Sequence, residues 1–413
     1  MDRGLIRSVH IFAAIIAVVV PALAGCLSPI ALHEAVLEYD RAANRIQSDM
    51  LLLNIARAHH FQPLHFTALS SVAATFEFST SVGMAPAQAG LTRTIISPIF
   101  GVSAAEKPTI TIVPIEGEDF TRRILAPMDS SRLSALFQQG ADFGLLFRLM
   151  ANALVLSGYG ESEYLMNDPS NREQYITFRR RVLHLSSLIL ARSLYVGPIV
   201  FEDSLPISIS QGLPSGEGLA ALDKVILAQE KGYYWSNRGN DRTAVLTKQI
   251  IGRIAVTNYD VTKLPNDVRR RLNEEANQLP ANAVLVDVRP GDAGGDYPIH
   301  GYFVLRSFHA MMRFIANGID AAPEFHVEKD ARTGEIGKNP PWTLVIEETG
   351  KRPDEAAFAI RHEGHWYSIR KAPQVEGLVF PWNQEAFRLL NHLYQMTVTE
   401  LRDVPTPAIT IAK

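Results

Sequence analysis

Between residues 28 and 60, apolar residues recur at alternating spacings of four and three positions. A period of about 3.5 residues is that of an α-helix whose apolar stripe packs along another element. Ser28 and Pro29 come first, in the order typical of a helix start: a capping hydroxyl, then proline at the first helical position. A long helix is therefore predicted from about residue 29 to His60, packed on a core or, alternatively, in a coiled coil. The stripe consists of Leu32, Val36, Tyr39, Ala43, Ile46, Met50 and Leu53.

The pattern changes to alternation after Pro63, which is predicted to end this helix. Residues 65–79 alternate between apolar and polar types and predict a strand. Residues 80–107 are rich in Ser, Ala, Gly and Thr and carry few charges, which predicts a loop or an extended excursion. We expect this stretch to be mobile or to face a partner. Residues 109–113 predict a further strand.

Residues 117–280 combine helical and strand patterns. A helix is predicted to start at Pro169, capped by Asp168. The stretches 233–236 and 243–257 flank a turn-rich insert and predict a hairpin, and residues 195–201 predict a strand. The predicted helices are 117–125, 131–139, 143–157, 169–194, 218–231 and 262–279.

The last third of the chain is predicted to form a unit of its own. Its order of strand, helix, two strands and helix favours an antiparallel or mixed sheet with helices on one face. With the long N-terminal helix and a helical middle that contains short strands, the fold class is α+β. The predicted strands are 283–288, 301–305, 342–347, 356–362 and 365–370, and the predicted helices are 307–317 and 383–398.

The N-terminus carries the pattern of a secretory signal. Arg3 and Arg7 precede an apolar run, residues 11–20, and small residues lead to Gly25 and Cys26. Leu23-Ala24-Gly25-Cys26 resembles the lipobox of bacterial lipoproteins, in which cleavage falls between the residues matching Gly25 and Cys26 and the cysteine becomes lipidated. An uncleaved anchor and a plain signal peptide are the alternatives, but Pro21 interrupts the run and a spanning helix needs about 20 apolar residues.

Cys26 is the only cysteine in the chain. If it is acylated, disulfides, zinc–thiolate sites and thiol catalysis are excluded. A stable tether needs two or more acyl chains, as a mature bacterial lipoprotein would carry. Leu27 stands where the enterobacterial sorting rule would have Asp for retention in the inner membrane. The resemblance therefore implies an outer-membrane lipoprotein, and we expect it on the periplasmic face.

Composition narrows the function further. Without residues 1–25 the chain would carry 38 basic and 42 acidic residues, a net charge of −4. This balance argues against nucleic acid as a partner, since phosphate binding needs clustered positive charge. The predicted organisation is a signal peptide at 1–25, an N-terminal domain at 26–160, a mainly helical middle at 161–280, a C-terminal unit at 281–400 and a tail at 401–413.

No motif points to chemistry. His59, His60 and His65 cluster where the first helix ends, and His362 and His365 flank a predicted two-residue turn; both groups favour structural roles over metal binding, because zinc sites need three or four ligands with support around them. No Gly-x-Ser-x-Gly or phosphate-binding loop is present. We expect no catalytic residue, no metal and no cofactor.

Several segments resemble a widespread group of uncharacterised bacterial lipoproteins. The resemblance implies an envelope location and no particular activity. Among these segments, Asn54, Arg57, His65 and Thr67 are polar residues in apolar surroundings, which predicts a hydrogen-bonded cluster or, alternatively, a polar ligand pocket. The segments are 51–57, 63–67, 117–123, 305–308 and 364–367.

These observations predict a non-catalytic binding or assembly component of an envelope complex, held to the membrane by the lipid on Cys26, with envelope proteins as partners. Residues 80–107 and the first helix are the expected partner surfaces. The alternatives are an envelope hydrolase acting on glycan or lipid and a carrier of a small hydrophobic ligand.

Overall fold

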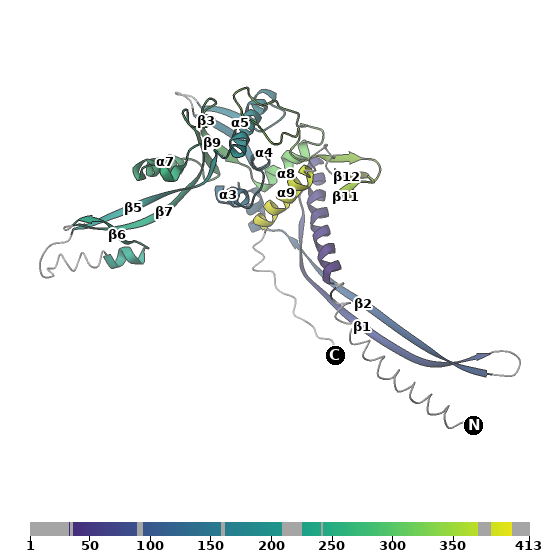
Figure 1. Cartoon of the computed structure of the whole chain (residues 1–413). Helices are drawn as coiled ribbons and strands as arrows, with labels where there is room; N and C mark the ends of the chain where they lie inside the picture. The colour runs from purple at the N-terminus through teal and green to yellow at the C-terminus, as the bar shows by residue number, and fades with distance from the viewer. Residues whose placement is uncertain are drawn as a thin grey trace. The chain divides into compact units, whose positions relative to one another are not determined.

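The computed structural model describes residue 33 and residues 36–88, 94–157, 162–208, 225–240, 243–370 and 381–398 (Figure 1). The chain divides into two compact units. The first consists of Met1–Asn54, Pro63–Glu118 and Glu400–Lys413, and the second of Ile55–Gln62 and Asp119–Thr399. Helices and sheets occur together throughout, so the predicted α+β class is confirmed.

The predicted N-terminal helix is present over residues 36–59, and from Ile55 onward it belongs to the second unit. The apolar stripe predicted for this helix does not coincide with the side of the helix that is buried. Val36 and Ile46 are exposed, whereas Leu51 and Leu52 have almost no exposed surface. Burial is concentrated near the C-terminal end of the helix, so periodicity alone gave the correct element and the wrong buried positions.

The first unit contains a two-stranded antiparallel sheet, β1 (Phe66–Gln88) and β2 (Thr94–Ile115). The two strands pair along their whole length, from Phe66 opposite Ile115 to Gln88 opposite Thr94, with one irregularity between Leu69 and Ser71. At about 3.3 Å per residue, such strands extend roughly 70 Å. We call this pair the ribbon. For residues 80–107 the sequence predicted a loop or an extended excursion. Most of these residues form the outer parts of the two ribbon strands.

The second unit begins with three helices, α2 (Glu118–Leu125), α3 (Ser130–Gln138) and α4 (Phe143–Met150). Asp129 and Asp142 cap the last two by accepting hydrogen bonds from backbone N–H groups. The prediction of one helix over residues 143–157 is wrong, because the chain leaves α4 at Ala151 and continues as a strand. The helix and the strand that follows it are both apolar and mostly buried, so the hydrophobic pattern does not show where one ends and the other begins.

A seven-stranded mixed sheet forms the centre of this unit, in the order β4-β3-β9-β8-β7-β5, with β6 also paired to β7. β7 and β8 are parallel, and the other neighbours are antiparallel. The hairpin predicted between β6 and β7 is present. The strands are β3 (Ala151–Ser157), β4 (Ser162–Met166), β5 (Tyr195–Ser208), β6 (Tyr234–Asn240), β7 (Thr243–Thr257), β8 (Ala283–Val288) and β9 (Ile299–Leu305).

Three helical segments accompany this sheet. α5 (Arg172–Leu190) starts three residues later than predicted, because Asn171 is its cap and Asp168 accepts from Ser170 in the turn before it. Residues 225–230 are helical, within the stretch predicted at 218–231. The helix predicted at 262–279 is divided at Pro265 into a 3₁₀ turn, Val261–Lys263, and α7 (Asn266–Gln278), since proline disfavours helical backbone in the residue before it.

A second sheet has three antiparallel strands in the order β10-β12-β11, followed by the last helix. The predicted boundary at 281 does not coincide with a structural one: β8 pairs with β7, and β9 pairs with β3, within one sheet. The boundary at 160 likewise falls between the paired strands β3 and β4. The remaining elements are α8 (Phe308–Asn317), β10 (Ile346–Thr349), β11 (Ala356–His362), β12 (His365–Arg370) and α9 (Trp382–Val398).

Candidate functional site

Gly25 and Cys26, the predicted cleavage and lipidation residues, lie outside the described residues. Within the part of the chain that the structure describes, no helix has both the length and the apolar character needed to cross a membrane.

Asn54 connects the N-terminal helix to the strand that follows it. Its side chain is fully buried, donates to the backbone oxygen of His65 at 2.8 Å and accepts from the backbone nitrogen of His65 at 2.8 Å. The hydroxyl of Thr67 donates to the sulfur of Met50, whose backbone oxygen also accepts from Asn54. Three of the four predicted polar residues therefore meet around Met50, and His65 contributes its backbone to the Asn54 bonds. Arg57 is half-buried and belongs to the second unit.

The second unit brings together histidines that are about 300 positions apart in the sequence. The end of the N-terminal helix supplies His59 and His60, and the β11–β12 hairpin supplies His362 and Tyr367. His60 Nε2 lies 2.7 Å from the Tyr367 hydroxyl, and the rings of His60 and His362 have centroids 5.6 Å apart. We call these four residues the histidine cluster.

Acidic and amide side chains surround the cluster. His59 Nε2 lies 3.4 Å from Glu348 Oε2, and His365 Nδ1 lies 2.5 Å from the other oxygen of the same carboxylate. Gln62 donates to Glu363 at 2.5 Å, and its amide oxygen lies 3.0 Å from His362 Nε2. His59, His60 and Gln62 therefore each have a partner on the three-stranded sheet or in its hairpin turn.

Burial determines the electrostatics of the cluster. Tyr367 is fully buried, which raises the pKa of its hydroxyl well above the usual range, and the nearby Glu348 carboxylate raises it further. Burial lowers the pKa of His362. The Tyr367 hydroxyl therefore stays protonated and is not prepared to act as a nucleophile. No set of three or more His, Cys, Asp or Glu among the described residues is arranged to hold a metal ion.

The two-residue turn predicted at residues 363–364 is present, with His362 directly opposite His365 in the strand pairing. Glu363 and Gly364 both have positive φ values, 46° and 89°, as a tight hairpin turn of this kind requires. We predicted that His362 and His365 are strand residues on either side of a turn, and the structure confirms this.

A charged network occupies the interior of the second unit. Glu324 accepts hydrogen bonds from Arg148 at 3.2 Å, from the Tyr175 hydroxyl at 2.7 Å and from the Thr343 backbone at 2.5 Å, and Arg179 lies 3.7 Å away. Burial alone would raise the pKa of Glu324, but the two guanidinium groups outweigh it and the pKa is lowered. A buried, fully bonded carboxylate holds segments together and has no free proton to exchange.

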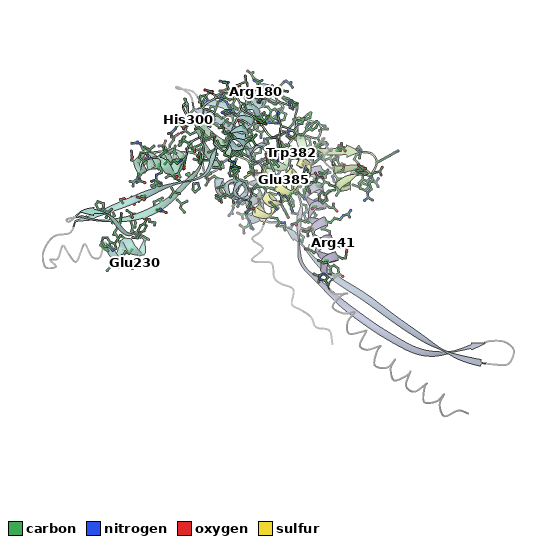
Figure 2. All side chains as sticks on the ribbon, in the orientation of Figure 1. Arg41, Arg180, Glu230, His300, Trp382 and Glu385 are labelled. Atoms are coloured by element: carbon green, nitrogen blue, oxygen red, sulfur yellow. The ribbon has the colours of Figure 1, made fainter. Side chains whose placement is uncertain are left out.

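A second ionic group lies at the sheet, where β8 and β9 pair. Asp287 accepts from the Tyr259 hydroxyl and from Arg289 Nε, both at 2.7 Å, and lies 3.2 Å from His300 Nδ1. Burial would raise the pKa of Asp287, but these partners lower it, and Asp287 in turn raises the pKa of His300. His300 is half-exposed and is labelled in Figure 2. Its other ring nitrogen lies 3.3 Å from Glu275, so both nitrogens have acidic neighbours.

The ribbon contains the longest strands among the described residues. In paired strands, alternate residues share a face and directly opposite residues lie on the same face. From Ser71 onward the register therefore divides the ribbon into two alternate sets of residues. The even-numbered set holds most of the large apolar residues and includes Val72, Phe76, Phe78, Val82, Met84, Ile96, Phe100, Val102 and Ile110, together with Glu106. The odd-numbered set is rich in Ser and Thr and also includes Glu77, Lys107, Ile95 and Ile99.

Comparison of the chain with protein-family models, with curated proteins and with solved structures finds no match.

Proposed function

We propose that this protein is a lipid-anchored component of the bacterial envelope, held at the outer membrane through Cys26, whose ribbon binds other proteins in an envelope assembly. The supporting observation is the ribbon itself. An isolated pair of strands is marginally stable in water unless it packs against further structure. A pair of this length, in which one alternate set of residues is mostly apolar, therefore favours a partner.

The rest of the described structure supports a binding role over a catalytic one. Buried titratable groups of the second unit bond to one another, as Tyr175 and Arg148 do to Glu324. In the sequence, Cys26 lies 40 positions before Phe66, the first residue of the ribbon. A lipid on Cys26 would therefore tether the chain not far from the proposed binding surface.

The tether is tested by Cys26→Ser. In cells given labelled palmitate, the wild-type protein is expected to sediment with outer membranes and carry label, and the variant to do neither. Equal sedimentation and no label in the wild type would contradict the anchor.

The binding role is tested by a variant that keeps the base of the ribbon. Ala73 and Thr109 are directly paired, so joining them through Asn-Gly replaces the outer strands by a tight turn. In-cell crosslinking followed by mass spectrometry is expected to recover a stoichiometric partner with the full chain and to lose it with this variant. Recovery of the same partner from both would contradict the ribbon as the binding surface.

A further inference from the structure

We propose that His184 is a pH switch: in its neutral form it holds two surface segments, residues 289–298 and 326–334, on α5, and its protonation releases them. We call these segments the first loop and the second loop. Neither contains a helix or a strand, and both belong to the second unit, as α5 does. The proposal involves neither the ribbon nor Cys26, so it does not depend on the function proposed above.

His184 has 1% of its surface exposed, and each of its ring nitrogens faces one of the two loops. Nε2 lies 2.9 Å from the backbone oxygen of Gly294 in the first loop, and Nδ1 lies 3.4 Å from the hydroxyl of Thr333 in the second. A carbonyl oxygen only accepts, so Nε2 carries the hydrogen and Nδ1 accepts from the hydroxyl. One neutral imidazole therefore connects both loops to the helix.

The first loop lies directly against α5 at this point. Gly294 has a φ of +74°, and a Cβ added there would lie 2.5 Å from Leu188 and 3.1 Å from His184 Nε2. The ring of Tyr297 approaches the imidazole edge-on, with centroids 5.2 Å apart. A charged imidazole in this position would lose its hydration, which is costly unless an opposite charge replaces it.

The charged groups around His184 do not supply such a partner. Arg181 on α5 and Arg332 in the second loop have guanidinium carbons 3.7 and 3.9 Å from the centroid of the Tyr297 ring. The nearby acid, Asp330, bonds to Arg332 through both carboxylate oxygens, at 2.8 and 2.9 Å. Protonated His184 would therefore be a third cation beside one tyrosine ring.

The direction of the pH effect follows from these contacts. Burial, with the charges of Arg181 and Arg332, lowers the pKa of His184, although the Gly294 carbonyl and Asp330 act in the opposite sense. In a released, hydrated state the imidazole regains an ordinary pKa of about 6.5. The released form then binds protons better than the closed form, so acid shifts the equilibrium toward release. The shift begins near pH ~6.5 and grows as the pH falls toward the lowered value.

Release changes the surface that α5 presents. Leu188 and Tyr297 are 5% and 4% exposed in the closed form, and the first loop contributes to their burial. When the loops leave, this apolar surface becomes accessible. The switch thus converts a fall in pH into the exposure of a surface that is hidden at neutral pH.

The test is hydrogen exchange of the full chain in detergent micelles between about pH 7.5 and about pH 5, with rates corrected for the intrinsic pH dependence of exchange. Peptides from both loops are expected to lose protection several-fold as the pH falls below about 6.5. Peptides from β8, which is buried throughout, are expected to keep theirs. NMR of ring-labelled histidines gives the titration of His184 itself in the same samples.

Two variants define the role of the imidazole. His184→Gln stays neutral at every pH and keeps a donor for the Gly294 carbonyl. We expect its loops to show less than a twofold change over the same range. His326→Gln is the matched control, because this histidine lies in the second loop with its side chain 48% exposed, and its loops are expected to behave as in the wild type. If His184→Gln does not fold, the wild-type titration decides, since the midpoint of loop release must follow that of His184.

Three results would overturn the proposal. The first is protection of both loops that persists while His184 titrates. The second is the same loss of protection in His184→Gln as in the wild type. The third is a simultaneous loss in β8, because acid would then unfold the unit as a whole and not release the loops.

Discussion

The Nε2 atom of His60 lies 2.7 Å from the hydroxyl oxygen of Tyr367, a residue 307 positions further along the chain. Tyr367 is fully buried on β12, and His60 stands at the end of the N-terminal helix. The bond therefore fixes the end of a helix to a sheet that is completed only near the end of the chain.

Tyr367→Phe removes this hydroxyl and keeps the ring. We expect the free energy of unfolding to fall by about 1 kcal/mol, the usual net value of one hydrogen bond, more if His60 is left without a partner. Urea unfolding followed by fluorescence measures the change. His365→Gln is the control, since its side chain is 56% exposed and a surface ion pair contributes less than about 1 kcal/mol. A loss in the control equal to that in Tyr367→Phe would contradict the assignment.

Glu324→Ala is expected to destabilise the second unit by about 3–5 kcal/mol, because Arg148 and Arg179 would be left as buried charges without their carboxylate. The matched control is Glu328→Ala, whose side chain is 82% exposed; we expect a change within about 0.5 kcal/mol. The measurement is the midpoint of urea unfolding of each variant. Equal midpoints for the two variants would show that the network around Glu324 contributes little to stability.

Stability should depend on pH through His300. Asp287 raises the folded-state pKa of this histidine, so the folded protein holds the proton more tightly than the unfolded chain. The resulting stabilisation is fully present below the unfolded pKa of about 6.5 and is lost as pH rises through the raised folded value. Because His300 is half-exposed, the gain is below about 1 kcal/mol.

His300→Gln tests this dependence. The difference in unfolding free energy between wild type and variant is expected to be largest near pH 5.5 and to shrink at higher pH. Asp287 stays ionised over this range, since its pKa is lowered. A difference that grows with pH would contradict the sign.

Gly301 lies on β9 at a point where the backbone of β3 leaves no room for a side chain. Its φ is +155°, and a Cβ added there would lie 2.0 Å from the backbone oxygen of Val155. Gly301→Ala is expected to cost more than about 2 kcal/mol, because backbone atoms must move. Gly197→Ala on β5 is the matched control, since its added Cβ meets nothing within 4 Å. Thermal unfolding compares the two, and similar midpoints would contradict the prediction.

Sequence patterns located most of the elements but not the points where one type of element becomes another. α4 and β3 form one apolar run, and only the pairing of Ala151 with Leu305 shows where the strand begins. The outer strands of the ribbon were missed for a different reason. Small residues such as Ser, Ala and Gly have weak strand preference, so their alternation with Phe78, Val82 and Phe100 became clear only with the register.

The candidate sites were predictable only where they are local. The sequence indicated the helix-end polar residues, and Asn54 holds His65 eleven positions away. The sequence also singled out His59 and His60 at the end of the first helix and His362 beside a predicted turn. It did not indicate that these histidines are in contact, because contacts across about 300 positions depend on the tertiary fold. The buried partners of Glu324 were missed for the same reason.

The strand order of the central sheet has a consequence for biogenesis. β9 lies between β3 and β8, so the sheet cannot close until the polypeptide has been synthesised as far as Leu305. Such non-local pairing makes folding slow relative to helical proteins of similar size. A chain that stays open this long exposes the edges of β3 and β8 while it is being synthesised, and chaperone protection at this stage would limit aggregation.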